Sequence, residues 1–181
     1  MHFAAGRHSA DQVPLERLSG SAVVVDISTA AAAQADYQAS VQDLLAWEAA
    51  NGLIPPRAIV LFRSGWSKRW PDAQGYLGTA ERGAEAVPKL HFPGISEAAA
   101  RWLVAREVSA VGIDTASVDH GQSTDFMAHR VLYEANIPGF ENVARLDLLP
   151  ARGAWVVALP MKIRGGSGAP LRIAAFVPAS D

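Results

Sequence analysis

Short apolar runs, separated by polar and glycine-containing segments, are the main pattern of the chain. The run SAVVVDIS at 21–28 is rich in β-branched residues, and PPRAIVLFRSGW at 55–66 and SAVGID at 109–114 repeat the pattern. Runs of this length are typical of buried strands. Two later runs, 154–166 and 170–179, flank a glycine-rich stretch and predict a β-hairpin.

Helical spacing appears between these runs. The segment 39–52 carries apolar residues at helical intervals, with Ser40 as a predicted N-cap and Gly52 as a predicted C-cap. The segment 95–108 has the same character, and its predicted N-cap is Ser96. Both segments are therefore expected to be helices packed against the strands.

The remaining segments are less regular. The segment 123–137 predicts a third helix, capped by Ser123 or Thr124, and 140–149 predicts a short strand or turn followed by a loop. The segment 67–94 is polar, rich in Gly and Pro and without a clear period, so it predicts a long loop.

The order of the predicted elements indicates the fold class. Strands and helices alternate early in the chain, and a hairpin closes it, which is typical of α/β proteins with a mixed sheet. The chain has no internal repeat and no linker-like segment. We expect residues 1–181 to form one α/β domain, a mixed β-sheet flanked by helices.

Composition excludes several classes of protein. The 181-residue chain is 50% hydrophobic and 19% charged, with a formal net charge of −2, which is ordinary globular composition without a nucleic-acid-binding signal. The absence of cysteine excludes disulfides, thiolate metal sites and a cysteine nucleophile. No apolar run reaches the roughly 18 residues of a membrane span, and no signal peptide is recognisable. We therefore expect a soluble, cytoplasmic protein.

Histidine and carboxylate side chains are the first candidates for chemistry. A single histidine is more often a surface or hydrogen-bonded residue than a ligand. His129 lies on the predicted helix 123–137, and Glu141 follows twelve residues later. Because an unpaired buried carboxylate is costly, Glu141 either points to solvent or has a cation or metal as its partner. Imidazole plus carboxylate is the ligand chemistry of Zn²⁺, Mn²⁺ and Fe²⁺. The other histidines are His2, His8, His91 and His120.

Polar residues also follow two predicted strands. The stretch GIDTASVDHG at 112–121 carries two aspartates. They either cap free backbone N–H groups in a turn, which we favour, or form the wall of a pocket at the carboxyl end of a strand. In RSGWSKRW at 63–70, Trp66 and Trp70 either cover the edge of the core or line an aromatic site, where Arg63 would meet an anion.

Two common motifs are absent from the sequence. The stretch GGSGAP at 165–170 lacks the Gly-Lys-Ser/Thr ending of a phosphate loop and opens no helix. No serine lies in a G-x-S-x-G elbow, which argues against an α/β-hydrolase.

Several stretches, taken together and in order, resemble one family. They are FRSGW, FPGISEAAARWL, VGIDTASVDHG, MAHRVLYEANIPGFENVARLDLLP and PMKIRGGSGAPLRI. Together they resemble the cyclase family of metal-dependent hydrolases, which includes bacterial kynurenine formamidases and isatin hydrolases. The resemblance covers almost the whole chain and contains His129 and Glu141 in their family context. It implies the family's swivelling β/α/β-like fold.

The family signature resembles the very start of the chain. It reads His-x-Gly-Thr-His-x-Asp-x-Pro-x-His-Phe; two of its histidines and its aspartate bind metal, and its last histidine acts in proton transfer. Here only the final pair is present, as His2 and Phe3, and the stretch that follows resembles the family's next segment. We expect the chain to begin inside its active-site motif and to lack the N-terminal part of the domain.

The resemblance implies roles for named residues. His129 and Glu141 match two metal ligands, His2 matches the catalytic histidine, and Phe3 and Trp66 are expected to contact an aryl substrate. A divalent ion, Zn²⁺ or Mn²⁺, would activate the water that hydrolyses an aryl formamide or cyclic amide, a C–N bond other than a peptide bond. Kynurenine formamidases carry out this chemistry in tryptophan catabolism.

Two other interpretations stay open. The chain could be a truncated, metal-poor remnant that acts as a binding or structural module with little activity. A misplaced start codon would instead mean a longer and fully active natural protein. The resemblance further implies a homo-oligomer, dimer or tetramer, with a small-molecule amide substrate and no nucleic-acid or membrane partner.

Overall fold

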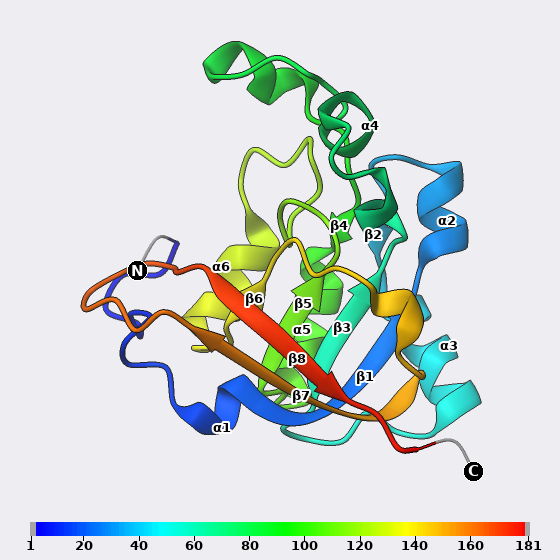
Figure 1. Ribbon diagram of the computed structural model, residues 1–181, viewed down its shortest axis with the longest axis vertical. Helices are drawn as coiled ribbons and strands as arrows, with labels where there is room; N and C mark the ends of the chain where they lie inside the picture. Colours follow the sequence, from blue (N-terminus) through cyan, green and yellow to red (C-terminus); the bar gives the residue numbers. More distant parts are fainter. Residues whose placement is uncertain (1–2, 180–181) are drawn as a thin grey trace.

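The computed structural model describes residues 3–179, and its centre is a six-stranded sheet (Figure 1). The strand order is β6-β5-β3-β1-β7-β8, in which β6, β5, β3 and β1 run parallel and β7 and β8 pair antiparallel. This is the predicted mixed sheet. Its strands are β1 (Ser19–Asp26), β3 (Ile59–Arg63), β5 (Ala110–Ile113), β6 (Gly139–Phe140), β7 (Arg152–Pro160) and β8 (Leu171–Phe176).

Helices occupy the predicted segments and the chain between them. The predicted helices are found as α3 (Val41–Asn51), α5 (Glu97–Ala105) and α6 (Met127–Glu134). The other regular elements are α1 (Leu15–Leu18), α2 (Ser28–Ala33), α4 (Ala73–Leu77), a two-stranded sheet of β2 (Gln38–Ala39) and β4 (Gly94–Ile95), and the 3₁₀ turns η1 (Trp66–Arg69), η2 (Ala84–Lys89) and η3 (Leu146–Leu148). Within the described residues, no helix is long and apolar enough to cross a membrane.

Helix boundaries follow local hydrogen bonding. At α3, Ser40 and Asp43 form a reciprocal capping box, as the predicted N-cap requires. At α5, the Ser96 hydroxyl accepts the Ala99 N–H at 3.2 Å. The predicted cap of α6 at Ser123 or Thr124 is wrong, because the helix begins at Met127 and its first N–H groups are bound by a carboxylate from a distant loop, described below.

The segment 67–94, predicted as a long loop, is more ordered than expected. It contains η1, α4, η2 and the start of β4, each too short to leave a period in the sequence. Trp66, Tyr76 and Phe92 anchor these turns in a small apolar cluster with Ala31. Figure 1 shows the resulting projection above the sheet, around α4.

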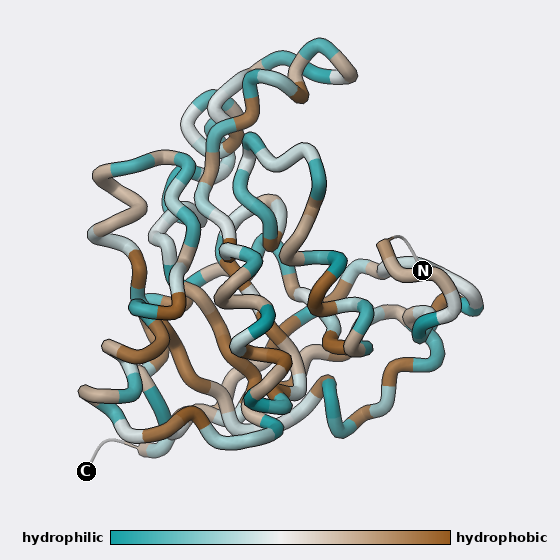
Figure 2. The backbone as a smooth tube through the Cα atoms, turned by 180° about the vertical axis from the view of Figure 1, so that it is seen from behind, coloured by the Kyte–Doolittle hydropathy of each residue, from teal (hydrophilic) through white to brown (hydrophobic). Residues whose placement is uncertain are grey.

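Both faces of the parallel part of the sheet are buried, which explains the unbroken apolar runs of its strands. Along β1, Val23 and Val25 point to one face while Ala22 and Val24 point to the other. Figure 2 shows the hydrophobic positions gathered along these strands. The first face packs against buried residues of α3, α5 and α6, namely Leu44, Trp47, Ala99, Ala100, Leu103, Ala128 and Leu132.

The second face is covered differently. No long helix lies on it among the described residues; the segment after β6 and the curled β7–β8 hairpin cover it instead (Figure 1). The buried residues here include Phe140, Val143 and Leu146 from that segment, and Ala154 and Val156 from the hairpin. The candidate site lies beside this apolar layer.

Candidate active site

The structure brings His129 and Glu141 into contact. His129 lies on α6 and is 6% exposed, and Glu141 directly follows the short strand β6. The distance between His129 Nε2 and Glu141 Oε1 is 3.1 Å. The imidazole and carboxylate that the sequence singled out therefore share one site, formed where α6 and β6 meet.

A second carboxylate lies on the other side of the imidazole. Asp119 is 3% exposed, and its Oδ2 lies 2.5 Å from His129 Nδ1. Its two oxygens also accept the backbone N–H groups of Ala128 at 2.8 Å and of His129 at 3.1 Å. Asp119 therefore caps α6 in place of the predicted serine or threonine.

These two carboxylates set the electrostatics of the site. Burial lowers the pKa of His129, but its hydrogen bonds to Asp119 and Glu141 and the charges of both outweigh burial and raise this pKa to about 9. Burial, together with nearby carboxylates, raises the pKa of Tyr133 and of Tyr76, so both remain neutral phenols. The surroundings of the imidazole favour positive charge.

Both aspartates of the loop after β5 accept backbone N–H groups, which is the interpretation that we favoured, and neither is among the residues that line the cavity described below. Asp114 accepts the N–H groups of Ser64 at 2.7 Å and Gly65 at 2.9 Å, and this is the expected turn capping. Asp119 caps a helix but also lies against His129, at the carboxyl end of the parallel strands. The neighbouring Val118 N–H donates to Glu141 Oε1 at 3.2 Å.

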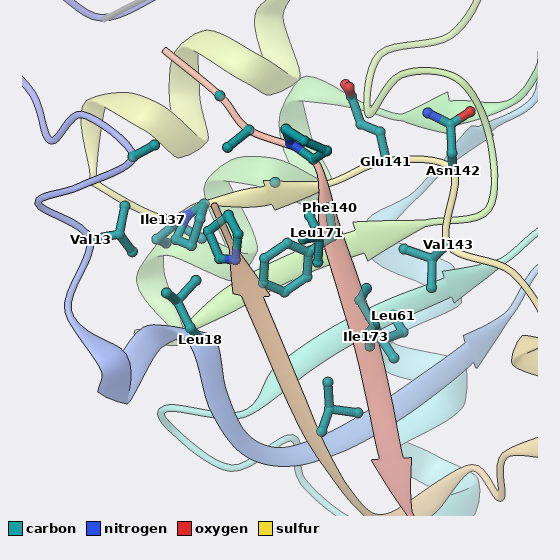
Figure 3. A pocket seen from close by; sticks show the side chains of 18 of the residues that line it. Val13, Leu18, Leu61, Ile137, Phe140, Glu141, Asn142, Val143, Leu171 and Ile173 are labelled. Atoms are coloured by element: carbon teal, nitrogen blue, oxygen red, sulfur yellow. The ribbon is translucent and has the colours of Figure 1, made fainter. Parts of the chain in front are cut away.

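A large cavity opens beside this group. Its volume is about 1040 Å³, and both His129 and Glu141 lie in its wall. Figure 3 shows Glu141 and Asn142 near one end of the pocket, while Leu18, Leu61 and Ile173 line the apolar part over the sheet. His129 and Glu141 therefore face a mostly apolar cavity of a size that suits a small organic molecule.

Aromatic rings surround the imidazole on the cavity side. The ring centroid of Phe3 lies 4.5 Å from that of His129, and that of Tyr133 lies 5.1 Å from it in an edge-on arrangement. Phe126 packs against Phe3 with 5.1 Å between centroids. Phe3 also lines the cavity, and its contact with an aryl substrate stays a prediction.

The tryptophan-rich stretch lies elsewhere. Trp66 is 2% exposed, its indole N–H donates to the Tyr76 carbonyl at 2.8 Å, and the Arg69 guanidinium stacks on its ring at 3.4 Å. It is absent from the lining of the cavity beside His129. Arg63 is paired with Asp26 at 2.7 Å. A substrate contact by Trp66 stays a prediction that the geometry does not support.

The remaining histidines are dispersed. His2 lies outside the described residues, so its catalytic role stays a prediction. His8 lines the cavity, and His91 pairs with Asp36 at 2.7 Å on the surface. In residues 3–179, no group of three or more His, Cys, Asp or Glu side chains is arranged to hold a metal ion. The described His, Asp and Glu side chains in the cavity lining are His8, His129 and Glu141, and the last two are in contact.

Two residues of the site were missed as site residues in the sequence. Asp119 lay in a stretch noted for its strand-end aspartates, but its contact with His129 depends on how α6 folds back onto that loop. Tyr133 lies one helical turn after His129, and this spacing was the available signal for its place beside the imidazole.

Comparisons with known proteins give a consistent result. The family model "Cyclase: Putative cyclase" matches residues 1–120. Isatin hydrolase of Roseibium aggregatum is 34% identical over 172 residues, which are 93% of this chain and 63% of that protein. Kynurenine formamidase of Salinibacter ruber is 30% identical over 174 residues, 95% of this chain and 69% of that protein.

A solved structure agrees with these relatives. Isatin hydrolase A from Labrenzia aggregata, bound to benzyl benzoate, superposes with a TM-score of 0.85 at 36% identity, over 96% of this chain and 66% of that one. The chain belongs to the cyclase family, and its mixed α/β fold matches that of this structural neighbour. It spans just under two thirds of the length of the isatin hydrolases that it matches.

Proposed function

We propose that this chain carries part of the active site of a metal-dependent hydrolase of aryl formamides or cyclic amides. The observation that carries the proposal is the His129–Glu141 pair, 3.1 Å apart in the wall of a large, mostly apolar cavity. Similarity to isatin hydrolase and kynurenine formamidase supports the reaction class. In both reactions water adds to an amide carbonyl and the C–N bond breaks.

The donor set fits a divalent metal in its chemistry. His129 Nε2 and Glu141 Oε1 are a nitrogen and an oxygen of the kinds that bind Zn²⁺ or Mn²⁺, and they converge on one point of the cavity wall. The carboxylates of Asp119 and Glu141, one at each ring nitrogen of His129, place negative charge around the site, and this supports a cation there. Two protein donors are fewer than the three or four of an ordinary site, so water, substrate or further side chains would complete it.

Different residues of the chain would have different roles in this reaction. When bound, a divalent ion supplies an activated water and stabilises charge on the carbonyl oxygen. His129 and Glu141 would hold the ion, while Phe3 and Tyr133 would contact the aryl ring of the substrate beside the imidazole. His2 would carry a proton from the attacking water to the leaving nitrogen. Formamide hydrolysis then releases an amine and formate, and hydrolysis of a cyclic amide opens the ring to an amino acid.

Metal titration tests the proposal on the chain itself. We expect weak binding of Zn²⁺ or Mn²⁺ that a chelator removes, because two protein ligands give a labile site. Calorimetric titration measures the affinity, and elemental analysis after dialysis measures retention. His129→Ala should abolish binding, whereas His91→Ala should not, because His91 lies on the surface, paired with Asp36. Equal affinity of the wild type and His129→Ala would refute the proposed ligand.

A second function has one observation in its favour. Since the described residues contain no cluster of three or more metal-binding side chains, the chain could act as a binding module for an apolar small molecule, with little catalysis. Titration with an aryl formamide distinguishes the two. Binding without turnover, unchanged by added Zn²⁺ or Mn²⁺, would favour the module.

We also propose a homo-oligomer. The β7–β8 hairpin exposes large apolar side chains, and β8 is the edge strand of the sheet, so this region supports self-association. Light scattering of the purified chain measures its mass; a monomer at all concentrations would contradict the proposal. The exposed side chains are Trp155, Leu159, Phe176 and Val177.

A further inference from the structure

The buried carboxylate of Asp119 has no part in the function proposed so far. It is 3% exposed and lies behind His129, on the side of the ring opposite Glu141. Its contacts are the Ala128 and His129 backbone N–H groups and the His129 Nδ1 atom. A group in this position can control which way the imidazole points.

Only a carboxylate can satisfy all three contacts. Both backbone N–H groups are donors, and carboxylate oxygens can accept from them and from an Nδ1 proton at the same time. An asparagine amide has one acceptor oxygen and one donor nitrogen, so either orientation would direct an N–H group at a backbone donor. The contacts of Asp119 are therefore those of a carboxyl group, and an asparagine could not keep all three.

This requirement determines the chemistry of the opposite ring nitrogen. With the Nδ1 proton directed at Asp119, Nε2 is the atom that faces Glu141 and the cavity. Metal-binding histidines commonly use such a carboxylate to fix their orientation and tautomer. The adjacent Val118 N–H holds Glu141 at 3.2 Å, so two consecutive residues position both candidate ligands.

We propose that Asp119 is the positioning residue of the site: it holds His129 with Nε2 toward the cavity, ready to bind a divalent cation. The inference rests on the proposed function for the identity of that cation. Asp119 acts through His129 and touches neither metal nor substrate. Through these hydrogen bonds, Val118 and Asp119 join the loop after β5 to Glu141 and to the start of α6.

The alternative is that Asp119 only caps α6. Asp114 is a matched control, because it is also buried, at 1% exposure, and accepts two backbone N–H groups, but it contacts none of the histidines within residues 3–179. Asp119→Asn and Asp114→Asn should both destabilise the fold in urea unfolding. If Asp119 only caps the helix, the two variants should bind Zn²⁺ with the same affinity.

The test follows Zn²⁺ binding and the His129 ring by NMR. We expect Asp119→Asn to weaken Zn²⁺ binding about 10- to 100-fold relative to the wild type, and Asp114→Asn to leave it within about 3-fold. Equal weakening in both variants, or none in Asp119→Asn, would overturn the proposal. Asp119→Glu, which keeps the carboxylate, should recover part of the affinity if the charge and acceptor oxygens matter.

A measurement on the metal-free wild type needs no variant. The His129 Nδ1 proton should be downfield and protected from exchange by its hydrogen bond to Asp119. An unprotected Nδ1 proton would overturn the positioning role even if Asp119→Asn fails to fold. The wild type could bind no Zn²⁺ while this proton is protected. In that case the proposed metal function fails, and Asp119 does not serve metal binding. The hydrogen bond by which Asp119 orients the His129 ring would still stand.

Discussion

Replacing Glu141 or His129 by alanine should abolish amide hydrolysis in a form of the chain that carries the complete family signature. That form has a segment with His-x-Gly-Thr-His-x-Asp-x-Pro-x joined ahead of His2. Each substitution removes one of the two donors that meet at 3.1 Å in the cavity wall, and loss of the metal removes the activated water. We expect kcat/KM to fall about 1000-fold or more, equivalent to about 4 kcal/mol of transition-state stabilisation.

The assay is hydrolysis of an aryl formamide or of isatin with added Mn²⁺ or Zn²⁺. His91→Ala and Glu97→Ala are the matched controls, since one removes a surface histidine and the other a surface glutamate paired with Arg101 on α5. Both should keep wild-type activity. His2→Ala should lower turnover with metal content near normal, because its proposed role is proton transfer. An inert extended chain, or unchanged rates in Glu141→Ala and His129→Ala, would refute the hydrolase assignment.

Gly94→Ala should destabilise the fold and should also disturb the candidate active site. A Cβ at Gly94 would lie 2.1 Å from the His120 backbone nitrogen and 2.4 Å from the Asp119 carbonyl carbon. Because backbone is less able to yield than a side chain, the Asp119–His120 segment must move. We expect a loss of about 3 kcal/mol in the free energy of unfolding, measured in urea, at the upper end for an overpacked interior.

Gly20→Ala is the control for this prediction. Gly20 lies in β1, and the nearest atom to a Cβ there is the Arg57 carbonyl oxygen at an ordinary 3.6 Å. Its unfolding free energy should stay within about 0.5 kcal/mol of the wild type. If Gly94→Ala is equally benign, the close packing of β4 against the loop that carries Asp119 is not a constraint on the site.

The sequence predicted those features that repeat along the chain. The apolar runs at 21–28 and 109–114 became β1 and β5, because strands buried on both faces need apolar residues at every position. The hairpin followed from its glycine-rich connection. The spacing of His129 and Glu141 gave two side chains that do meet, although eleven residues of α6, turn and β6 lie between them.

Other features depend on contacts between distant segments and left no local pattern. The N-terminus of α6 is capped by Asp119, so Ser123 and Thr124 suggested a boundary that the helix does not use. The turns of 67–94 are held by Trp66 and its neighbours in a separate cluster, which a search for periodicity cannot detect. The same burial places Trp66 away from the cavity where the sequence suggested a role for it.

The central claim is that His129 and Glu141 bind one divalent ion in the cavity wall. Anomalous X-ray diffraction from crystals of the chain soaked in Zn²⁺ tests it most directly. We expect a single strong peak about 2.0–2.2 Å from His129 Nε2 and from a Glu141 carboxylate oxygen, with His129 Nδ1 still bonded to Asp119. A zinc peak at another site, such as the surface pair Asp36–His91, with none between His129 and Glu141, would contradict the account.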